Sequence, residues 1–163
     1  RSQGGNNNSY CQPGEMNWFD WETEDRHLEF EAFLRGLVEI RRSRGLFLAE
    51  RYLHAGPDAR HNRFARWLRP DGGAMHPEDW NDPDNRSTGL LLHESGTFLL
   101  MALNAGDAPL DFALPGDAAR CWAPLVDTEK GIADPGAEPV IDGAAVTLAA
   151  RSLLLLEARG RAS

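Results

Sequence analysis

Hydrophobic residues follow a helical period in one early stretch of the chain, between residues 24 and 44. Apolar side chains recur there at spacings of three and four, in the series Phe30, Phe33, Leu34 and Leu37. Residues at these spacings share one face of an α-helix, so the stretch predicts a single amphipathic helix. Such a face must pack against a large partner, since an exposed apolar face is a liability for an isolated chain.

The two ends of this stretch carry typical helix signals. Thr23 is placed for the N-cap, and acidic residues follow it where the helix dipole favours anions. Arginines fill the last turn before Gly45, which is placed for the C′ position. Glu31 and Arg35 are spaced for an i, i+4 ion pair. We therefore interpret the acidic cluster at residues 22–25 as a helix N-terminus and not as a pair of general acid–base catalysts.

The period changes to two in the second half of the chain. Residues 63–69 alternate between apolar and polar side chains, and the turn sequence Pro70-Asp71-Gly72-Gly73 follows. Short apolar segments bounded by Gly, Pro, Asp or Asn then recur at 88–93, 97–103, 110–114, 121–126, 144–148 and 152–156. About seven short strands with frequent turns predict an antiparallel β-sandwich or barrel.

Three local features refine this prediction. Asp142-Gly143 carries the signal of a hairpin turn. The continuous apolar run 153–156 is expected in a central strand that is buried on both faces, and Trp122 is expected in the core. Residues 45–62 resemble a linker tethered by apolar side chains, which places a domain boundary near residue 60 and divides the chain into residues 1–59 and 60–163.

Composition and charge narrow the classes of function. The chain is 42% hydrophobic and carries a net charge of −8, so nucleic acid and anionic membranes are not expected as partners. No apolar run approaches the ~20 residues of a membrane span, and the chain opens without a signal segment. Cys11 and Cys121 read as reduced thiols of a cytoplasmic protein, with a single disulfide as the alternative. The five histidines have no ligand spacing, so no metal or other cofactor is expected.

The first residues form a loop whose composition suits a sugar ligand. Paired glycines, three consecutive asparagines and Pro13-Gly14 exclude a helix or strand. Amides bind hydroxyl groups through paired donors and acceptors, and Tyr10, Trp18 and Trp21 add flat apolar faces. The simpler alternative is an Asn-rich turn. Asp20 lies between two tryptophans, and we favour a role in capping or loop support over one in facing a sugar.

This loop also resembles a known family. Gly5-Asn6-Asn7-Asn8, then Tyr10-Cys11-Gln12, then Trp18-x-Asp20-Trp21 is similar to the glycogen debranching enzymes of the isoamylase type, within the α-amylase superfamily. The similarity continues through Trp67-Leu68, Pro70-Asp71-Gly72, Met75 and Asp79-Trp80 to Leu103-Asn104, Phe112, Trp122 and Asp127-Thr128. The chain departs from the family pattern at Pro13-Gly14 and Ala74.

The resemblance implies a fold and a domain organisation. It implies an antiparallel Greek-key β-sandwich preceded by a loop and one long helix from the end of a catalytic (β/α)8 barrel. Residues 1–59 would then be the end of the barrel, and residues 60–163 the C-terminal sandwich. The chain starts with Arg1 in mid-loop, and we expect it to be the C-terminal piece of a larger enzyme, whose N-terminal remainder is one partner.

The resemblance further implies hydrolysis of α-1,6 branch linkages in glycogen-type glucans by a retaining mechanism. Such a reaction needs two carboxyl groups across the scissile bond. The motifs that carry them in the family do not occur in this chain, so we expect the chain alone to be inactive. Its contribution would be substrate contact, through Asn6, Asn7, Asn8, Tyr10, Gln12 and Trp18.

A non-catalytic carbohydrate-binding or structural β-sandwich module is the alternative. It would bind glucan through Trp80 or Trp67. Trp80 follows Asp79 in a loop rich in Asp, Asn and Pro, and its indole could either contact glucan or fill the seam between barrel and sandwich. From the sequence, we favour the seam.

Overall fold

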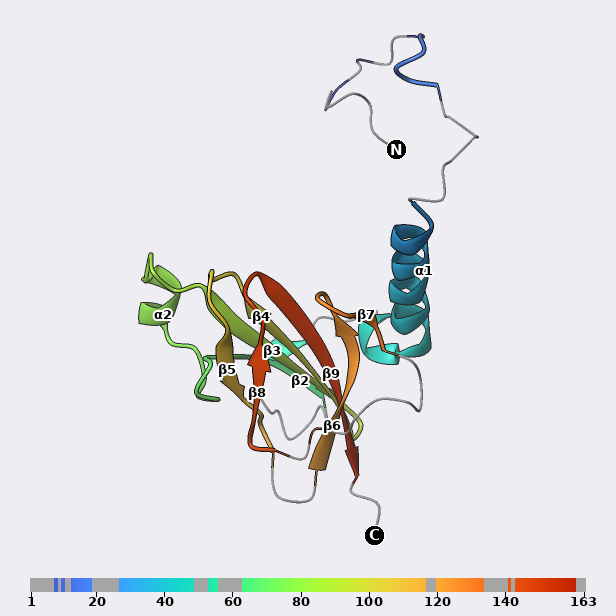
Figure 1. Ribbon diagram of the computed structural model, residues 1–163. Helices are drawn as coiled ribbons and strands as arrows, with labels where there is room; N and C mark the ends of the chain where they lie inside the picture. Colours follow the sequence, from blue (N-terminus) through green and yellow to red (C-terminus); the bar gives the residue numbers. More distant parts are fainter. Residues whose placement is uncertain are drawn as a thin grey trace.

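The computed structural model describes residues 8, 10, 13–18, 27–48, 53–55, 63–116, 120–133, 141 and 143–160. Its elements in chain order are α1 (Leu28–Ser43), the 3-10 turn η2 (Gly45–Phe47), β1 (His54–Ala55), β2 (Arg63–Leu68), α2 (Pro77–Asn81), β3 (Ser87–Glu94), β4 (Thr97–Asn104), β5 (Leu110–Ala113), β6 (Arg120–Asp127), β7 (Gly131–Ile132), β8 (Ala145–Leu148) and β9 (Ser152–Gly160). The structure is mainly β, as predicted, with α1 beside the sheets (Figure 1). All seven predicted segments form strands.

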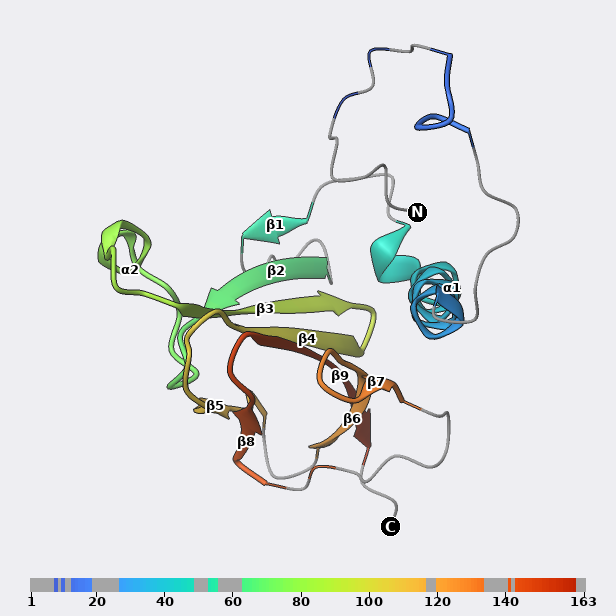
Figure 2. The same ribbon diagram turned by 45° about the horizontal axis from the view of Figure 1, so that its top comes forward.

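Two sheets make up the body of the structure. One has the strand order β1-β2-β3-β4-β9-β6-β7, and the other pairs β5 with β8. β1 runs parallel to β2, and the other ladders are antiparallel. β9 lies between β4 and β6, with Leu154, Leu155 and Leu156 buried (Figure 2). The prediction that residues 153–156 form a central strand is therefore confirmed.

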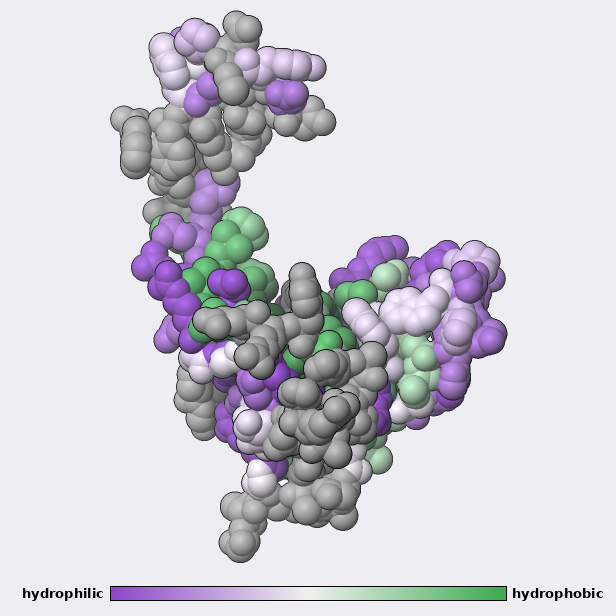
Figure 3. Space-filling view, turned by 180° about the vertical axis from the view of Figure 1, so that it is seen from behind, coloured by the Kyte–Doolittle hydropathy of each residue, from purple (hydrophilic) through white to green (hydrophobic). Residues whose placement is uncertain are grey.

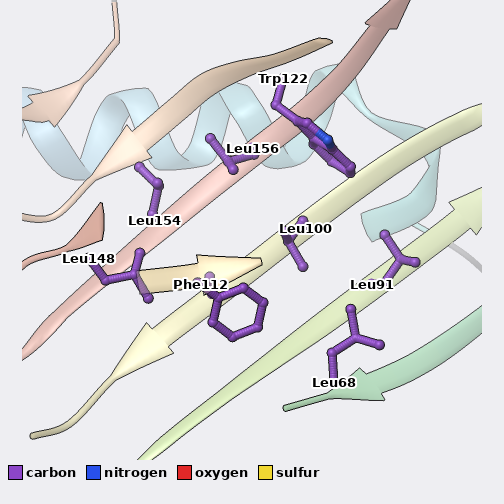
Figure 4. Packing of buried hydrophobic residues seen from close by; sticks show 9 residues of the cluster. Leu68, Leu91, Leu100, Phe112, Trp122, Leu148, Leu154 and Leu156 are labelled. Atoms are coloured by element: carbon purple, nitrogen blue, oxygen red, sulfur yellow. The ribbon is translucent and has the colours of Figure 1, made fainter. Parts of the chain in front are cut away.

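One face of the large sheet packs against the small sheet. Phe112 of β5 and Leu148 of β8 meet a set of buried side chains from the large sheet, among them Leu68, Leu100 and Trp122 (Figure 4). Trp122 is buried in this core, as predicted. Because successive side chains of a strand point to opposite faces, the neighbours of these residues along each strand form the second face.

The second face of the large sheet is partly covered by α1. Phe33, Leu37 and Ile40 of the helix pack against a cluster that includes Leu99 and Leu155. After the helix, Arg44 donates from Nε to Oε1 of Glu157 on β9 at 3.0 Å, and both side chains are about four-fifths buried. This ion pair and the apolar contacts fix the helix to the sheet.

The ends of α1 correct part of the prediction. The helix begins at Leu28, not at residue 24, and His27 is its N-cap without a side-chain hydrogen bond. The acidic residues of the first turn are Glu29 and Glu31, whereas the predicted cap Thr23 lies outside the described residues. At the other end the arginine-rich last turn is confirmed. The predicted i, i+4 pair is also confirmed, because Arg35 Nη2 donates to Glu31 Oε1 at 2.6 Å.

The connection after α1 contains a strand that was not predicted, and the segments on either side of the predicted hairpin turn pair with other strands. Leu46 is buried against the second face, so the stretch is tethered as expected, but it also contains β1, which extends the large sheet. Asp142 of the predicted hairpin turn lies outside the described residues. Ile141 before it bridges to Trp122 of β6, and β8 after it pairs with β5. Strands and helices as short as β1, β7 and α2 span too few residues to show a hydrophobic period.

Candidate functional site

The predicted substrate loop is described at Asn8, Tyr10 and residues 13–18. Asn8 accepts the backbone N–H of Tyr10 on Oδ1 at 2.9 Å, which is the local turn that Asn side chains form with the backbone two residues on. Tyr10 has a φ of 50° and is 77% exposed. The Asn8 side chain therefore shapes the backbone that presents the Tyr10 ring.

A second turn presents Trp18. The backbone N–H groups of Asn17 and Trp18 donate to the Gly14 carbonyl at 2.9 and 3.2 Å, and Trp18 is 65% exposed. No ring contact joins Tyr10 and Trp18, although both belong to the described part of the chain. The other predicted contacts, Asn6, Asn7 and Gln12, lie outside the described residues, as do Asp20 and Trp21.

An aromatic pair lies at the end of β2, far from this loop in the sequence. The ring centroids of Trp67 and Trp80 are 5.3 Å apart with an interplanar angle of 86°, and the two residues are 46% and 54% exposed. Edge-to-face contact at this separation is a favoured arrangement of two aromatic rings. Both tryptophans stand out in the sequence as candidate glucan contacts, but no sequence pattern indicates that their rings touch.

A tight reversal of the chain brings the two rings together. The Arg69 N–H donates to the Gly73 carbonyl at 2.7 Å, and Gly72 has a φ of +83° that suits glycine. The returning strand pairs alongside β2, since Ala74 bridges to Leu68 and the Met75 N–H donates to the Trp67 carbonyl at 3.0 Å. The helix α2 then starts two residues later and carries Trp80 to the Trp67 ring.

The helix α2 is held in place by local hydrogen bonds. The His76 N–H donates to Asp79 Oδ2 at 2.7 Å at its start. Asn81 donates from Nδ2 to the Pro77 carbonyl, and Asn85 donates from Nδ2 to the Asp79 carbonyl, at 2.7 and 3.1 Å. This loop, though exposed, therefore presents Trp80 in a defined position.

An ion pair closes the turn that precedes α2. Arg69 donates from Nε and Nη2 to the two carboxylate oxygens of Asp71 at 3.2 and 3.1 Å. The pKa of Asp71 is lowered, mainly by the hydrogen bond from Arg69 and next by that from the Gly73 N–H. The pKa of Arg69 is raised, mainly by its hydrogen bond to Asp71. Both groups remain charged at neutral pH, where they stabilise the turn.

Two carboxylates of the described residues are occupied in ion pairs. The side chains of Glu94 and Glu157 are largely buried. Glu94 pairs with Arg63, and Glu157 pairs with Arg44. Within the described ranges, no three His, Cys, Asp or Glu side chains are grouped to hold a metal ion. The helices of the described part also include none with the length and hydropathy of a membrane span.

The chain is similar to several known proteins. The chain is 30% identical over 150 residues to the glycogen operon protein GlgX homolog of Mycobacterium tuberculosis (strain H37Rv), covering 82% of this chain and 21% of that protein. It is 31% identical over 131 residues to the glycogen debranching enzyme of Cronobacter sakazakii, covering 80% and 18%. It is 29% identical over 174 aligned positions to an isoamylase from Flavobacterium sp, covering 98% and 22%.

The chain thus spans about a fifth of the length of the curated relatives it matches. A family model described as "Isoamylase, C-terminal" matches residues 64–157, from β2 into β9. This match covers the small sheet, most of the large sheet except β1, and more than half of the chain, in agreement with the resemblance found in the sequence. The chain therefore belongs to the isoamylase C-terminal family.

Proposed function

We propose that this chain is the C-terminal part of a glycogen debranching enzyme that hydrolyses α-1,6 branch linkages by a retaining mechanism. The observation that carries the proposal is the family match over residues 64–157, together with relatives named glycogen debranching enzyme and isoamylase that are about five times longer. The catalytic carboxyl groups would lie in the longer protein, outside this chain. The chain would supply a loop at the substrate groove and the C-terminal domain.

We include the finer architecture in the proposal. Residues 1–59 would be the end of a (β/α)8 barrel, and residues 60–163 a Greek-key sandwich. The strand order supports the sandwich, because the chain passes from β4 to β5 in the small sheet, back to β6, and again through β8 to β9. A cytoplasmic location belongs to the same proposal, and the buried, free thiol of Cys121 supports it.

The surface of α1 supports a role as the last barrel helix. Phe33 and Leu37 face the sheet, whereas Phe30, Leu34 and Val38 form a second apolar stripe that is 63%, 45% and 47% exposed. Hydrophobic side chains of α1 are visible from behind in Figure 3, on the side of the helix toward the middle of the molecule. The apolar face of α1 is thus wider than its contact with the sheet, and an exposed apolar surface of this kind is typical of an interface. The proposed barrel would cover the stripe.

The loop around Asn8 and Tyr10 would contact glucan beside the active site. Its exposed rings at Tyr10 and Trp18 and its hydrogen-bonded turn support this part of the proposal. Asn6, Asn7 and Gln12 are included on the strength of the sequence motif alone.

The activity test compares the full-length enzyme with the 163-residue chain. We expect the full-length protein to release reducing ends and linear chains from glycogen, and the 163-residue chain to release none above a buffer blank. Within the full-length protein, Asn8→Ala should reduce kcat/KM for glycogen about tenfold if the Tyr10 turn contacts glucan, which corresponds to about 1.4 kcal/mol. Debranching by the 163-residue chain, or inactivity of the full-length protein, would contradict the proposal.

A further inference from the structure

We propose that Trp67 and Trp80 form a second glucan-binding surface that holds linear α-1,4-linked segments away from the catalytic site. The choice of glucan as ligand rests on the proposed function, while the surface itself rests on the geometry of the pair. Both indoles are about half exposed and meet edge to face. Two rings at a steep angle offer flat apolar surface in two directions, which suits a curved chain of sugar rings.

The surface formed by Trp67 and Trp80 is preorganised in the unliganded protein. Trp67 lies on a paired strand, and Trp80 on a short helix whose start is capped through His76 and Asp79. The reversal between them is closed by the Arg69–Asp71 pair. Because these hydrogen bonds already order the segment, binding would lose little conformational entropy.

The polar surroundings of the pair favour a sugar over a polypeptide. Trp80 stands on α2 among the exposed side chains of Glu78, Asn81 and Asp82. A pyranose ring has an apolar face of C–H groups and a rim of hydroxyl groups, so it needs an aromatic plane bordered by hydrogen-bonding groups. The negative charge of the chain favours a neutral ligand over an anionic one.

The exposed surface of α1 differs from the tryptophan pair, and this difference also favours glucan as the ligand of the pair. The exposed stripe of α1 is made of Phe30, Leu34 and Val38, which is the surface expected where another part of a protein packs. α2 and α1 lie at opposite ends of the large sheet in both ribbon views (Figures 1 and 2). A glucan at the tryptophan pair would therefore leave the α1 surface open for the proposed barrel. The competing possibility is that another part of the full-length protein covers the tryptophans.

The first experiment measures retention of the full-length enzyme in native gels that contain glycogen. We expect Trp80→Ala and Trp67→Ala each to weaken retention about tenfold, because aromatic contacts of this size are worth about one unit of log K. Trp80→Phe should keep most of the retention. Asp84→Ala is the matched control, since its side chain is exposed in the same loop and only its backbone N–H is hydrogen-bonded, to Asp82 Oδ1.

Turnover of a small branched dextrin and the Tm are measured on the same variants. We expect turnover to match the wild type, because the proposed surface takes no part in bond cleavage. The Tm of each alanine variant should fall slightly, because the edge-to-face contact between the two rings is lost. Unchanged retention in both alanine variants would overturn the proposal, whether or not the Tm falls. Wild-type protein without debranching activity would instead contradict the proposed function, so the two failures are distinguishable.

The second experiment needs no variant. Wild-type full-length enzyme is treated with an oxidant that modifies exposed indoles, with and without maltoheptaose, and the modified peptides are quantified by mass spectrometry. We expect Trp67 and Trp80 to react and to be protected by maltoheptaose, while Trp122, which is 2% exposed, stays unmodified. Unreactive Trp67 and Trp80 would mean that the protein covers them, and reaction without protection would mean that they bind no glucan. Either result rejects the surface.

Discussion

At the scale of single residues, close packing explains positions whose importance the sequence does not reveal. Gly89 lies in β3 directly under the Phe112 ring, and a Cβ at this position would stand 2.5 Å from Phe112 Cζ. Phe112 is fully buried, so its ring has no open space to move into. Asn104 is also buried and donates from Nδ2 to the carbonyls of Ala108 and Ala149, both at 2.9 Å. One amide thus joins the loop after β4 to the loop before β9.

Gly89→Ala should destabilise the protein by about 1–3 kcal/mol, because the added methyl group overpacks the core. Gly160→Ala is the control, since no atom lies within 4 Å of the position its Cβ would take. The free energy of unfolding is measured by urea denaturation. In a double-mutant cycle with Phe112→Leu the two costs should be less than additive, because the smaller side chain relieves the clash. Full additivity would show that Gly89 and Phe112 do not interact in this way.

At the scale of elements, short segments are positioned by hydrogen bonds and charge more than by a hydrophobic period. The turn before α2 is held by Arg69, Asp71 and Gly73, and the helix itself by its capping interaction. Such a segment depends on the charge of its carboxylates. Its stability should therefore depend on pH.

Asp71→Asn removes the charge of the side chain but keeps a hydrogen bond, because the amide oxygen can still accept the Gly73 N–H. The pKa of Asp71 is lowered in the folded state by Arg69 and the Gly73 N–H. A lowered pKa means that the carboxylate stabilises the fold above its unfolded pKa, and that this contribution is lost as the pH falls through the folded pKa. We expect the variant to have a slightly lower Tm than the wild type at neutral pH, and the gap to close in acid.

The Tm of the wild type and of Asp71→Asn is recorded by circular dichroism from neutral to acidic pH. Asp84→Asn serves as the control, with a pH profile that follows the wild type throughout. A gap for Asp71→Asn that stays constant into acid would show that the ion pair does not contribute.

At the scale of the whole molecule, the exposed stripe of α1 is consistent with a helix that packs between the sheets of this chain and the proposed barrel. Part of the apolar face of α1 packs on the large sheet, and the adjoining stripe of Phe30, Leu34 and Val38 is exposed in this chain. Gly36 lets the helix approach closely, since a Cβ there would stand 2.7 Å from Ile132 Cγ1 of β7. The helix is thus seated firmly on the sandwich while its outer stripe remains available.

Phe30→Gln should behave differently in the two contexts. In the 163-residue chain, where Phe30 is 63% exposed, the change in unfolding free energy should stay within about 0.5 kcal/mol. In the full-length enzyme it should cost about 2 kcal/mol or more, because a buried apolar side chain is lost. Glu39→Gln, also exposed on α1, should be near neutral in both. Equal effects of Phe30→Gln in both proteins would mean that the stripe stays exposed.

The sequence by itself determined the class of structure and the family. The alternation at 63–69 predicts β2, because a half-buried strand alternates, and the short apolar segments bounded by turn residues predict β3 to β6 and β8. The apolar run at 153–156 predicts that β9 is central, and both faces of β9 are indeed covered. The helix was predicted as well, although its first residue was not, because caps set a boundary less strongly than packing. The family followed from an unusually long motif, and the match to residues 64–157 bears it out.

Only the tertiary structure decided which distant residues meet. It paired β1 with β2 and β8 with β5, whereas the sequence carried a hairpin signal at Asp142-Gly143 but did not indicate these partners. It brought Trp67 and Trp80 into contact through a turn and a five-residue helix too short for any period. Periodicity reports which face of an element is buried, whereas pairing and side-chain contact depend on how the elements pack. For this reason the proposed glucan surface emerges only from the folded chain.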